Sequence, residues 1–400
     1  MNFIGMKNII WSNGHAVRFD DIVESDNCYL FDSKGNRLTD LESGVWCTSV
    51  GHNNKRINQA ICAQINKISH TGFCYCHPQL DVTVRKLLAI TGIHQGKCEF
   101  LCSGSEAVEY GMRLARAVSN RPLALAFSDA YFGAYGDAAT KDGHHWHVYN
   151  WLECSCSNTD EGCVGECKEF AKIPFDDIGF FVFEPGSSSG LVRFPSAALI
   201  SKIASRLQQQ GGFVFCNEIT TGIGRTAKWF GYQHYDLIPS LVAVGKGLGN
   251  GYPVSAVVAA EPLLHRLENK SFVFAQSHQN DPLGAVIANE VIDLIHQEKL
   301  IDGCQQMGVY LLSRLSELIG LNLSLKAVRG RGLMLALVFE TQAMAVFEKL
   351  LEKGFLVAKR PREEVLRLDP PLTITKEIAD LFLLALEEAI RETSFRERTY

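Results

Sequence analysis

Lys246 is the residue whose surroundings most clearly favour chemistry. It follows the apolar run Leu241–Val244, which we expect to form a buried strand, and it precedes the glycine-rich turn Gly247–Gly251. Burial lowers the pKa of a lysine because it disfavours the charged form, and a neutral lysine amine can attack an aldehyde. A lysine that merely caps a tight turn is the alternative interpretation of Lys246 taken alone.

Two other groups of residues favour the reactive lysine. The apolar run Phe213–Cys216 also ends in polar side chains, beginning with Asn217. Upstream, Ser103–Glu106 opens a helix whose first backbone N–H groups have no partner within the helix, and such a helix start binds phosphate. A phosphate site together with a lysine at a strand end is what a cofactor with an aldehyde and a phosphate requires.

The elements that position these residues follow from the apolar runs between about 120 and 260. These runs are typical of strands that are buried on both faces, as in a parallel sheet. A helix is predicted over Pro195–Gln210, with proline at its start and two glycines at its end. This alternation predicts an α/β fold with ligands at the carboxyl ends of the strands. The predicted strands are Leu123–Phe127, Phe180–Phe183, Phe213–Cys216 and Leu241–Val244.

The regions on either side predict a hairpin, several helices and a few short strands. Apolar residues recur at helical spacing in five of these segments, and turn residues separate the two arms of the hairpin. The expected elements are the hairpin 28–40, helices over about 54–68, from about Ser105, and over Pro282–Gln297, Asp302–Ile319 and Lys376–Glu392, a strand pair around Ala327–Val338, and strands around Phe355–Ala358 and Val365–Leu368.

The length of 400 residues predicts more than one domain. We predict an N-terminal segment over 1–50 that packs with the smaller domain. A large α/β domain that holds the lysine is expected over 51–265, and a small α+β domain over 266–400. With 46% hydrophobic and 21% charged residues, the chain has ample material for these cores.

Charge and cysteine content limit the partners and the compartment. A net charge of −5 gives no reason to expect nucleic acid or an anionic membrane as a partner. The sequence contains no apolar run that would form a signal peptide or a membrane span. Without a secretory signal, the 13 cysteines are expected to be reduced thiols. We therefore expect a cytoplasmic protein.

Several segments together resemble the class III, fold type I aminotransferases, which use pyridoxal 5′-phosphate. The similarity extends from about residue 28 to 385, and the segments are specific as a set. The resemblance implies a mostly parallel central sheet with helices on both faces and a smaller α+β C-terminal domain. The matching segments are SGSEAVEYGMRLAR (103–116), AYFGAYG (130–136), FVFEP (181–185), NEITTGIGRTAKWFGYQHY (217–235), GKGLGNGYPVSAV (245–257) and RLDPPLTIT (367–375).

The resemblance also implies roles for single residues. Lys246 would hold the cofactor as a Schiff base and move a proton during catalysis. Gly104 and Ser105 would bind the phosphate through backbone N–H groups, and Tyr131 would stack on the pyridine ring. The other implied cofactor contacts are Ser103, Glu184, Asn217, Thr220 and Ser277, the last of them reaching the phosphate in a neighbouring subunit.

The resemblance implies an enzyme that transfers amino groups in a ping-pong reaction. The amino donor would be an amino acid or an amine, and the acceptor a 2-oxo acid or an aldehyde. Val45 and Trp46 would line the substrate entrance, and Arg367 would bind a substrate carboxylate through its bidentate guanidinium. Shared active sites imply a homodimer.

Asn217 is the first departure from the family pattern, which has aspartate at this position. That carboxylate keeps the pyridine nitrogen protonated, whereas a neutral amide provides no charge pairing. Three interpretations stay open: an aminotransferase with a weaker electron sink, an engineered change, or a protein that no longer transaminates. The last would be a racemase, an aminomutase or a cofactor-binding protein without turnover.

Ser189 is the second departure. It falls where ornithine and 4-aminobutyrate aminotransferases have a glutamate that masks the carboxylate-binding arginine. We therefore expect Arg367 to stay free for a carboxylate, and we do not assign ornithine or 4-aminobutyrate as the substrate.

Two further patterns receive a different interpretation. Gly222–Ala227 fits a dinucleotide fingerprint, but the aromatic and glycine-broken segment after it does not predict the required helix. Cys154, Cys156, Cys163 and Cys167 are close in sequence but lack paired C-x2-C spacing. We expect an ordinary loop with reduced cysteines and no metal, and zinc binding remains the alternative.

Overall fold

The four predicted apolar runs all lie in one seven-stranded sheet of the computed structural model. The structure describes residues 8–72, 74–154, 163–189, 191–268, 270–321, 324–360 and 362–394. The strands from β9 to β6 are parallel, whereas β10 is antiparallel to both of its neighbours. The order is β4 (Gly96–Leu101), β10 (Ser255–Ala260), β9 (Leu241–Val244), β8 (Phe213–Asn217), β7 (Ile178–Phe183), β5 (Leu123–Phe127) and β6 (Trp146–Tyr149).

Burial on both faces explains why these strands lack polar alternation. Every residue of β7, β8 and β9 is buried. Aromatic side chains fill the layers beside them: the rings of Phe180 and Phe213 stack 5.5 Å apart, and Phe127 meets Phe181 edge to face at 5.1 Å. The carboxyl ends of the parallel strands are therefore positioned by a continuous core.

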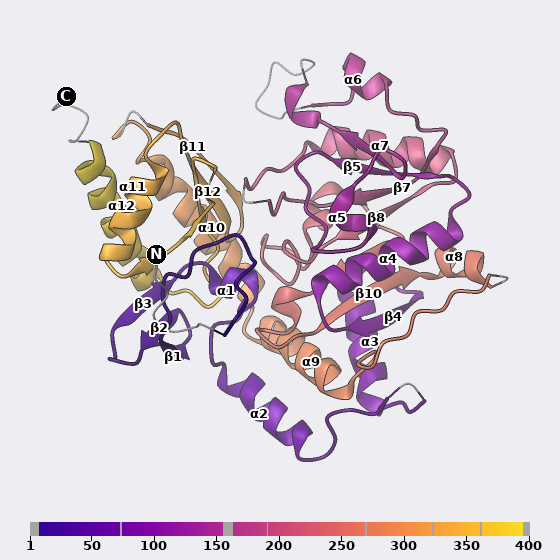
Figure 1. Cartoon of the computed structure of the whole chain (residues 1–400), viewed down its shortest axis with the longest axis horizontal. Coiled ribbons are helices and arrows are strands. Elements are labelled where there is room, and N and C mark those ends of the chain that lie inside the picture. The colour runs from indigo at the N-terminus through magenta and orange to yellow at the C-terminus, as the bar shows by residue number, and fades with distance from the viewer. Residues whose placement is uncertain are drawn as a thin grey trace.

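Helices pack against this sheet and determine where its loops begin (Figure 1). Helix α4 contacts β8, β9 and β10, and it approaches so closely that a Cβ on Gly111 would lie 2.3 Å from the ring of Phe215. The Ser103 hydroxyl caps α4 by accepting the backbone N–H of Glu106. The helices around the sheet are α2 (Lys55–Ile65), α3 (Pro78–Thr91), α4 (Gly104–Val118), α7 (Ala197–Gln209) and α9 (Pro282–Gln297).

Two smaller sheets lie beside the C-terminal helices (Figure 1). In one of them β13 pairs in parallel with β3, so the first strands of the chain share a sheet with residues 355–356. The first sheet contains β1 (Ile22–Asp26), β2 (Tyr29–Asp32), β3 (Arg37–Asp40) and β13 (Phe355–Leu356), and the second contains β11 (Leu325–Arg331), β12 (Met334–Phe339), β15 (Val365–Leu368) and β14 (Ala358–Lys359); the helices are α10 (Leu300–Ser316), α11 (Ala343–Glu352) and α12 (Lys376–Ser394).

Short elements complete the connections. Helix α1 is one irregular turn between the N-terminal strands and the large sheet, and the others lie in loops. They are α1 (Ser43–Trp46), α5 (Asp137–Thr140), α6 (Lys168–Ala171), α8 (Glu261–Leu264), η1 (Trp151–Glu153), η2 (Gly231–Tyr235), η3 (Lys246–Leu248) and η4 (His265–Leu267).

The strands predicted between 120 and 260 are confirmed, and β5 and β9 have the predicted bounds. The predicted helices are confirmed with shifts at their ends. Strands β1, β4, β6 and β10 and helices α3 and α11 were not predicted from the sequence. The division into 1–50, 51–265 and 266–400 stays a prediction.

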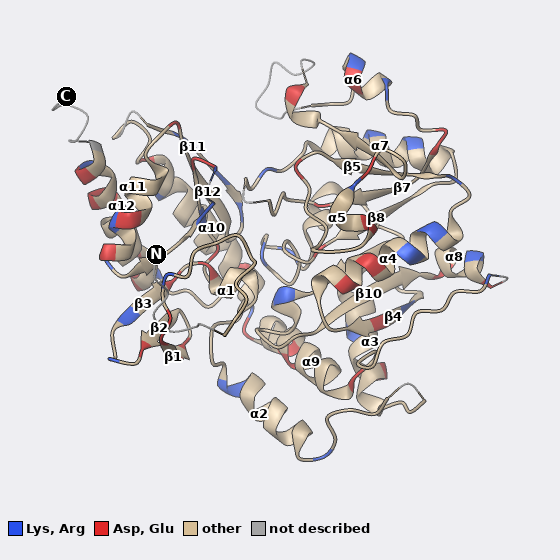
Figure 2. Cartoon of the chain, viewed as in Figure 1, with Lys and Arg blue, Asp and Glu red and all other residues tan. Residues whose placement is uncertain are grey.

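Charges of both signs are interspersed along the helices, as Figure 2 shows for α4. On the C-terminal helices Lys353 forms ion pairs with Glu388 and Glu392. Among the described residues, no helix combines the length and the apolar character that a membrane crossing needs.

Candidate active site

Lys246 lies at the carboxyl end of β9, as predicted, and its amine is buried. Its Nζ donates a hydrogen bond to the Thr220 hydroxyl at 2.9 Å and lies 4.8 Å from the centre of the Trp46 ring. Burial lowers the pKa of Lys246 to about 8, although nearby Cys47 and Glu184 oppose the shift. The backbone of Lys246 is left-handed, with φ of 45°, a strained conformation typical of functional sites.

A cavity of about 340 Å³ surrounds this amine. It opens where β8 and β9 end, at the edge of the sheet where an α/β fold binds its ligands. The cavity brings together most of the predicted site residues. Its lining consists of Val45, Trp46, Ser103, Gly104, Ser105, Tyr131, Phe132, Gly133, Ser188, Asn217, Ile219, Thr220, Lys246 and Arg360.

The start of α4 forms the anion-binding side of the cavity. Because the Ser103 hydroxyl takes the N–H of Glu106, the N–H groups of Gly104 and Ser105 remain for a ligand. Position 104 requires glycine, since a Cβ there would lie 2.6 Å from Cγ2 of Ile219. The Ser105 hydroxyl accepts the N–H of Ala134 at 3.1 Å and so fixes the loop opposite.

Asn217 and Glu184 hold the backbone of Tyr131 from two sides. The Asn217 amide nitrogen donates to the Tyr131 carbonyl at 3.0 Å, and its oxygen accepts the N–H of Ile219 at 3.3 Å. Glu184 accepts the N–H of Tyr131 at 3.1 Å and the hydroxyl of Ser188. Burial raises the pKa of Glu184 to about 7 despite these bonds. Glu184 does not line the cavity and acts through Tyr131.

The segment Ser43–Trp46 is a left-handed turn that carries Val45 and Trp46 into the cavity. Its four residues all have positive φ, between 48° and 67°. The carboxylate of Asp40 holds the turn by accepting the N–H of Gly44 at 3.0 Å, and His52 approaches the same carboxylate at 2.7 Å. A strained turn of this kind persists only where its surroundings determine it.

The expectation that Arg367 stays free is wrong. Its Nε donates to the carboxylate of Asp369, and its guanidinium carbon lies 3.5 Å above the centre of the Trp46 ring. Arg367 is 5% exposed and does not line the cavity. Although position 189 is a serine and not a glutamate, Arg367 is still masked, because it forms an ion pair with Asp369, only two residues away.

Arg360 is the arginine that lines the cavity, and it was not predicted from the sequence. Its guanidinium donates to the carbonyl of Ser188 at 3.3 Å, and burial lowers its pKa. Arg360 lies between β14 and β15, which pair antiparallel, so the hairpin returns it to the site. The sequence signal was its place between two predicted strands.

Other predicted contacts lie apart from this cavity. Ser277 is exposed and does not line it, so its predicted role in a neighbouring subunit stays a prediction. Of the four clustered cysteines, Cys156 lies outside the described residues.

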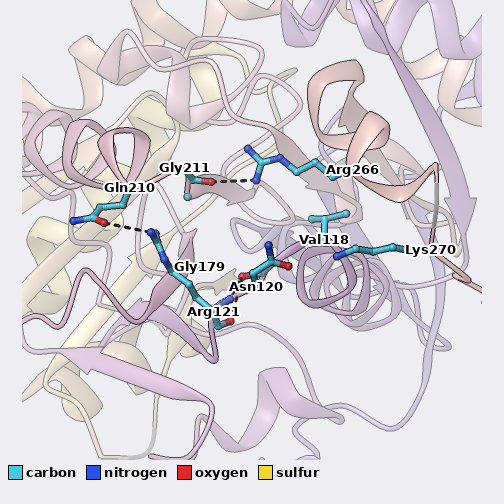
Figure 3. A pocket seen from close by; sticks show the side chains of 10 residues that line it. Val118, Asn120, Arg121, Gly179, Gln210, Gly211, Arg266 and Lys270 are labelled. Carbon is cyan, nitrogen blue, oxygen red and sulfur yellow. Dashed lines mark hydrogen bonds between the residues drawn. The ribbon is translucent and has the colours of Figure 1, made fainter.

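A larger cavity, of about 480 Å³, lies where β7 and β8 begin, and it contains none of these residues (Figure 3). Arg121, Arg266 and Lys270 line it, but each already donates to a backbone carbonyl, and Arg121 also contacts Gln210. The smaller cavity at Lys246 is therefore the candidate active site.

Comparisons with known proteins agree with this geometry. The chain belongs to the aminotransferase class-III family, whose model matches residues 10–390. It is 29% identical to the leucine/methionine racemase of Thermococcus litoralis, over 92% of this chain and 90% of that protein. It is 28% identical to an acetylornithine aminotransferase of Aquifex aeolicus, over 94% and 99% of the two chains. An S-selective transaminase from Arthrobacter sp. has the same fold, with a TM-score of 0.88, 21% identity and coverage of 98% and 97%.

The protein is therefore a class III aminotransferase of fold type I, with pyridoxal 5′-phosphate as its cofactor. The residues present fit this group: the start of α4 suits its phosphate, Lys246 its aldehyde, and Tyr131 its ring. The fit differs at the ring nitrogen, since Asn217 is an amide whose nitrogen already binds the Tyr131 carbonyl.

Proposed function

We propose that this enzyme transfers an amino group from an amino acid or amine to a 2-oxo acid or aldehyde in two ping-pong half-reactions. The observation that carries the proposal is the buried amine of Lys246, bonded to Thr220 and facing a helix start that suits a phosphate. Its lowered pKa of about 8 leaves a useful neutral fraction near neutral pH.

Bound pyridoxal phosphate supplies an aldehyde for condensation with amines and a ring that delocalises the electron pair released at the substrate Cα. Lys246 would hold the aldehyde of the cofactor, and its amine, when free, would accept and hold the proton from the substrate Cα. The Thr220 hydroxyl orients the lysine amine between these positions. Trp46 and Tyr131 form walls of the cavity in which the substrate would lie.

We propose Arg360, in place of Arg367, as the cation for a substrate carboxylate. Arg360 lines the cavity and uses one N–H in its bond to Ser188, whereas Arg367 does not line the cavity and its Nε is bonded to Asp369. Arg360→Ala should raise KM at least tenfold for an amino acid donor and leave KM for a monoamine nearly unchanged, as loss of a charge-assisted hydrogen bond predicts.

Arg367→Ala serves as the comparison for that experiment. It strands Asp369 in the core, so we expect loss of about 3–5 kcal/mol of stability and no selectivity between donors. A selective effect of Arg367→Ala, with none for Arg360→Ala, would return the role to Arg367.

A donor screen tests the overall reaction. Donors are added to the holoenzyme one at a time, and absorbance reports whether the lysine-bound form of the cofactor is consumed and then restored by a 2-oxo acid. We expect both changes in the wild type and neither in Lys246→Ala. A holoenzyme that responds to no amino acid or amine in a broad panel would contradict transamination.

Racemisation is the second candidate, and Asn217 and the racemase relative favour it. A neutral amide at the ring nitrogen weakens the electron sink, which suits a reaction that returns the proton to Cα. In the same screen without an acceptor, in D2O, racemisation gives the opposite enantiomer with deuterium at Cα and no oxo acid. Transamination gives stoichiometric oxo acid in a single turnover.

We also propose a cytoplasmic homodimer in which Ser277 reaches the partner's phosphate. The exposure of Ser277 on the isolated chain supports an intersubunit role. Light scattering should give twice the chain mass, and Ser277→Ala should weaken cofactor retention more than Ser271→Ala, a nearby exposed serine. A fully active monomer would refute shared sites.

A further inference from the structure

The connection between β6 and β7 gathers three cysteines that the aminotransferase reaction does not use. Cys154, Cys163 and Cys167 lie on either side of a segment outside the described residues, and their sulfur atoms are all within 4.8 Å of one another. Cys163 and Cys167 are 1% and 8% exposed. Three converging sulfur atoms in a mostly buried place are a potential set of metal ligands.

The spacing of the sulfur atoms suits one metal ion. Sγ of Cys163 lies 3.9 Å from Sγ of Cys167. Zinc binds thiolates at about 2.3 Å in a tetrahedron, which places neighbouring sulfur atoms about 3.8 Å apart. A disulfide needs a separation of about 2.05 Å, so this arrangement matches shared coordination better than a covalent link.

Hydrogen-bond donors point at the same sulfur atoms. The N–H of Gly165 donates to Cys163 and the N–H of Phe170 donates to Cys167, both at 3.3 Å. The Tyr149 hydroxyl lies 3.0 Å from Cys163 and 3.4 Å from Cys167. Such donors around the ligands stabilise thiolates over thiols and orient them toward a metal.

We propose that Cys154, Cys163 and Cys167 bind one zinc ion as thiolates. Each cysteine releases its proton to solvent when it binds, and no electron is transferred. Thiolate ligands select zinc or another thiophilic metal over magnesium and calcium, whose preferred ligands are oxygen atoms. The proposal depends only on these three described cysteines.

The zinc site would fix the loop next to the strand end that carries Tyr131. Tyr149, which contacts two of the cysteines, lies two residues from Trp151, and the indole of Trp151 donates to Asp129 at 2.9 Å. Its ring also packs against Phe127 at 5.8 Å. Asp129 precedes the cavity-lining Tyr131 by two residues, so the metal supports the active-site wall from behind.

Metal analysis of the untagged, full-length holoenzyme tests this site. After dialysis against a weak chelator, we expect about one zinc per chain in the wild type and below about a fifth of that in Cys163→Ser and Cys167→Ser. Cys62→Ser is the matched control, since Cys62 is exposed on α2, and it should keep its zinc.

A second measurement avoids variants that fail to fold. Cobalt(II) exchanged into the wild type should give intense near-ultraviolet absorption from charge transfer between thiolate and metal. Any of three results would overturn the proposal: a wild type without stoichiometric metal, copper or iron in place of zinc, or a native disulfide between Cys163 and Cys167 in mass spectrometry.

Discussion

At the scale of the residue, the reactivity of Lys246 depends on burial. The amine lies beside Trp46 and Thr220, where the charged form is poorly solvated, and this lowers its pKa to about 8. An exposed lysine near its ordinary pKa of about 10.4 would be almost fully protonated at neutral pH. The buried position of Lys246 at the end of β9 therefore determines how much of its amine is neutral near pH 7.

This lowered pKa predicts the pH dependence of cofactor capture. When pyridoxal phosphate is added to the apoprotein, the rate of covalent attachment should rise roughly tenfold per pH unit below about pH 8 and level off above it, because only the neutral amine attacks. Borohydride fixation followed by peptide mass spectrometry measures the rate at Lys246. A rate that still rises steeply at pH 10 would mean an ordinary lysine.

Asn217 is the other residue for which we propose a role in the reaction. In Asn217→Asp a carboxylate would pair with the protonated ring nitrogen, an interaction of roughly 1.5–3 kcal/mol. Since about 1.4 kcal/mol in a barrier is tenfold in rate, we expect proton removal at Cα to accelerate about tenfold or more. Single-turnover absorbance with Cα-protonated and Cα-deuterated donors measures this, and the wild type should show the larger isotope effect. Equal or slower removal in the variant would show that the enzyme is tuned to a neutral ring.

The same substitution should destabilise the apoprotein. Asn217 donates to the Tyr131 carbonyl, whereas a carboxylate oxygen there would face that carbonyl oxygen without a proton. The folded state would raise the pKa of the new carboxyl, so the loss of stability should be small near pH 4 and grow as pH rises to 8. Thermal melts of both apoproteins across this range provide the measurement, and a difference independent of pH would contradict the explanation.

At the scale of the element, the packing of α4 against the sheet positions the helix start that we propose to bind phosphate. Its N-terminus forms one side of the cavity, and its middle lies against β8 through Gly111. A Cβ at Gly111 would lie 2.3 Å from the Phe215 ring. A side chain at position 111 would therefore push α4, and with it the first turn of the helix, away from the sheet.

A pair of helical glycines tests this contact. Gly111→Ala should cost about 1–3 kcal/mol through overpacking and weaken cofactor binding as α4 moves outward. Gly303→Ala in α10, where a Cβ meets nothing within 4 Å, should instead stabilise the protein by about 0.5–1 kcal/mol. Denaturant unfolding and cofactor titration of both variants measure these effects. Similar results for the two glycines would show that close packing is not the cause.

At the scale of the whole molecule, buried carboxyl groups link stability to pH. Burial raises the pKa of Glu218 to about 7, although Thr221, Gly231 and Tyr232 donate to it. A folded-state pKa above the unfolded value means that the native protein binds the extra proton. The contribution of Glu218 to the free energy of unfolding is therefore fully present below about pH 4.5 and is lost as pH rises towards 7.

Melting temperatures should therefore decrease as pH rises. We expect the melting temperature of the apoprotein to fall between pH 5 and 8. In Glu218→Gln this fall should be smaller, because the amide cannot ionise. Glu169→Gln, an exposed glutamate on α6, is the control and should keep the wild-type dependence. A Glu218→Gln profile parallel to that of the wild type would assign the pH dependence to other groups.

Several features could be predicted from the sequence because their signals are local. The strands β5 and β9 are continuous apolar runs, and Lys246 and Ser103–Ser105 stand directly at element ends. Strands β4 and β10 were missed because alternation is weak in them and their pairing joins residues 96–101 to 255–260, far apart in the chain. Helix α3 was missed although His77 caps it and a proline starts it.

The sequence by itself determined the parallel α/β core and the places of Lys246 and Ser103–Ser105 at the ends of elements, since each depends on residues adjacent in the chain. Only the tertiary structure decided which arginine lines the cavity. Arg360 follows β14 and Arg367 lies in β15, the strand that pairs with β14, and the difference depends on Asp369 and Trp46, which hold Arg367 behind the cavity wall. It also decided that Cys154 meets Cys163 and Cys167. Such contacts depend on how the backbone folds back on itself, and local periodicity carries no information about them.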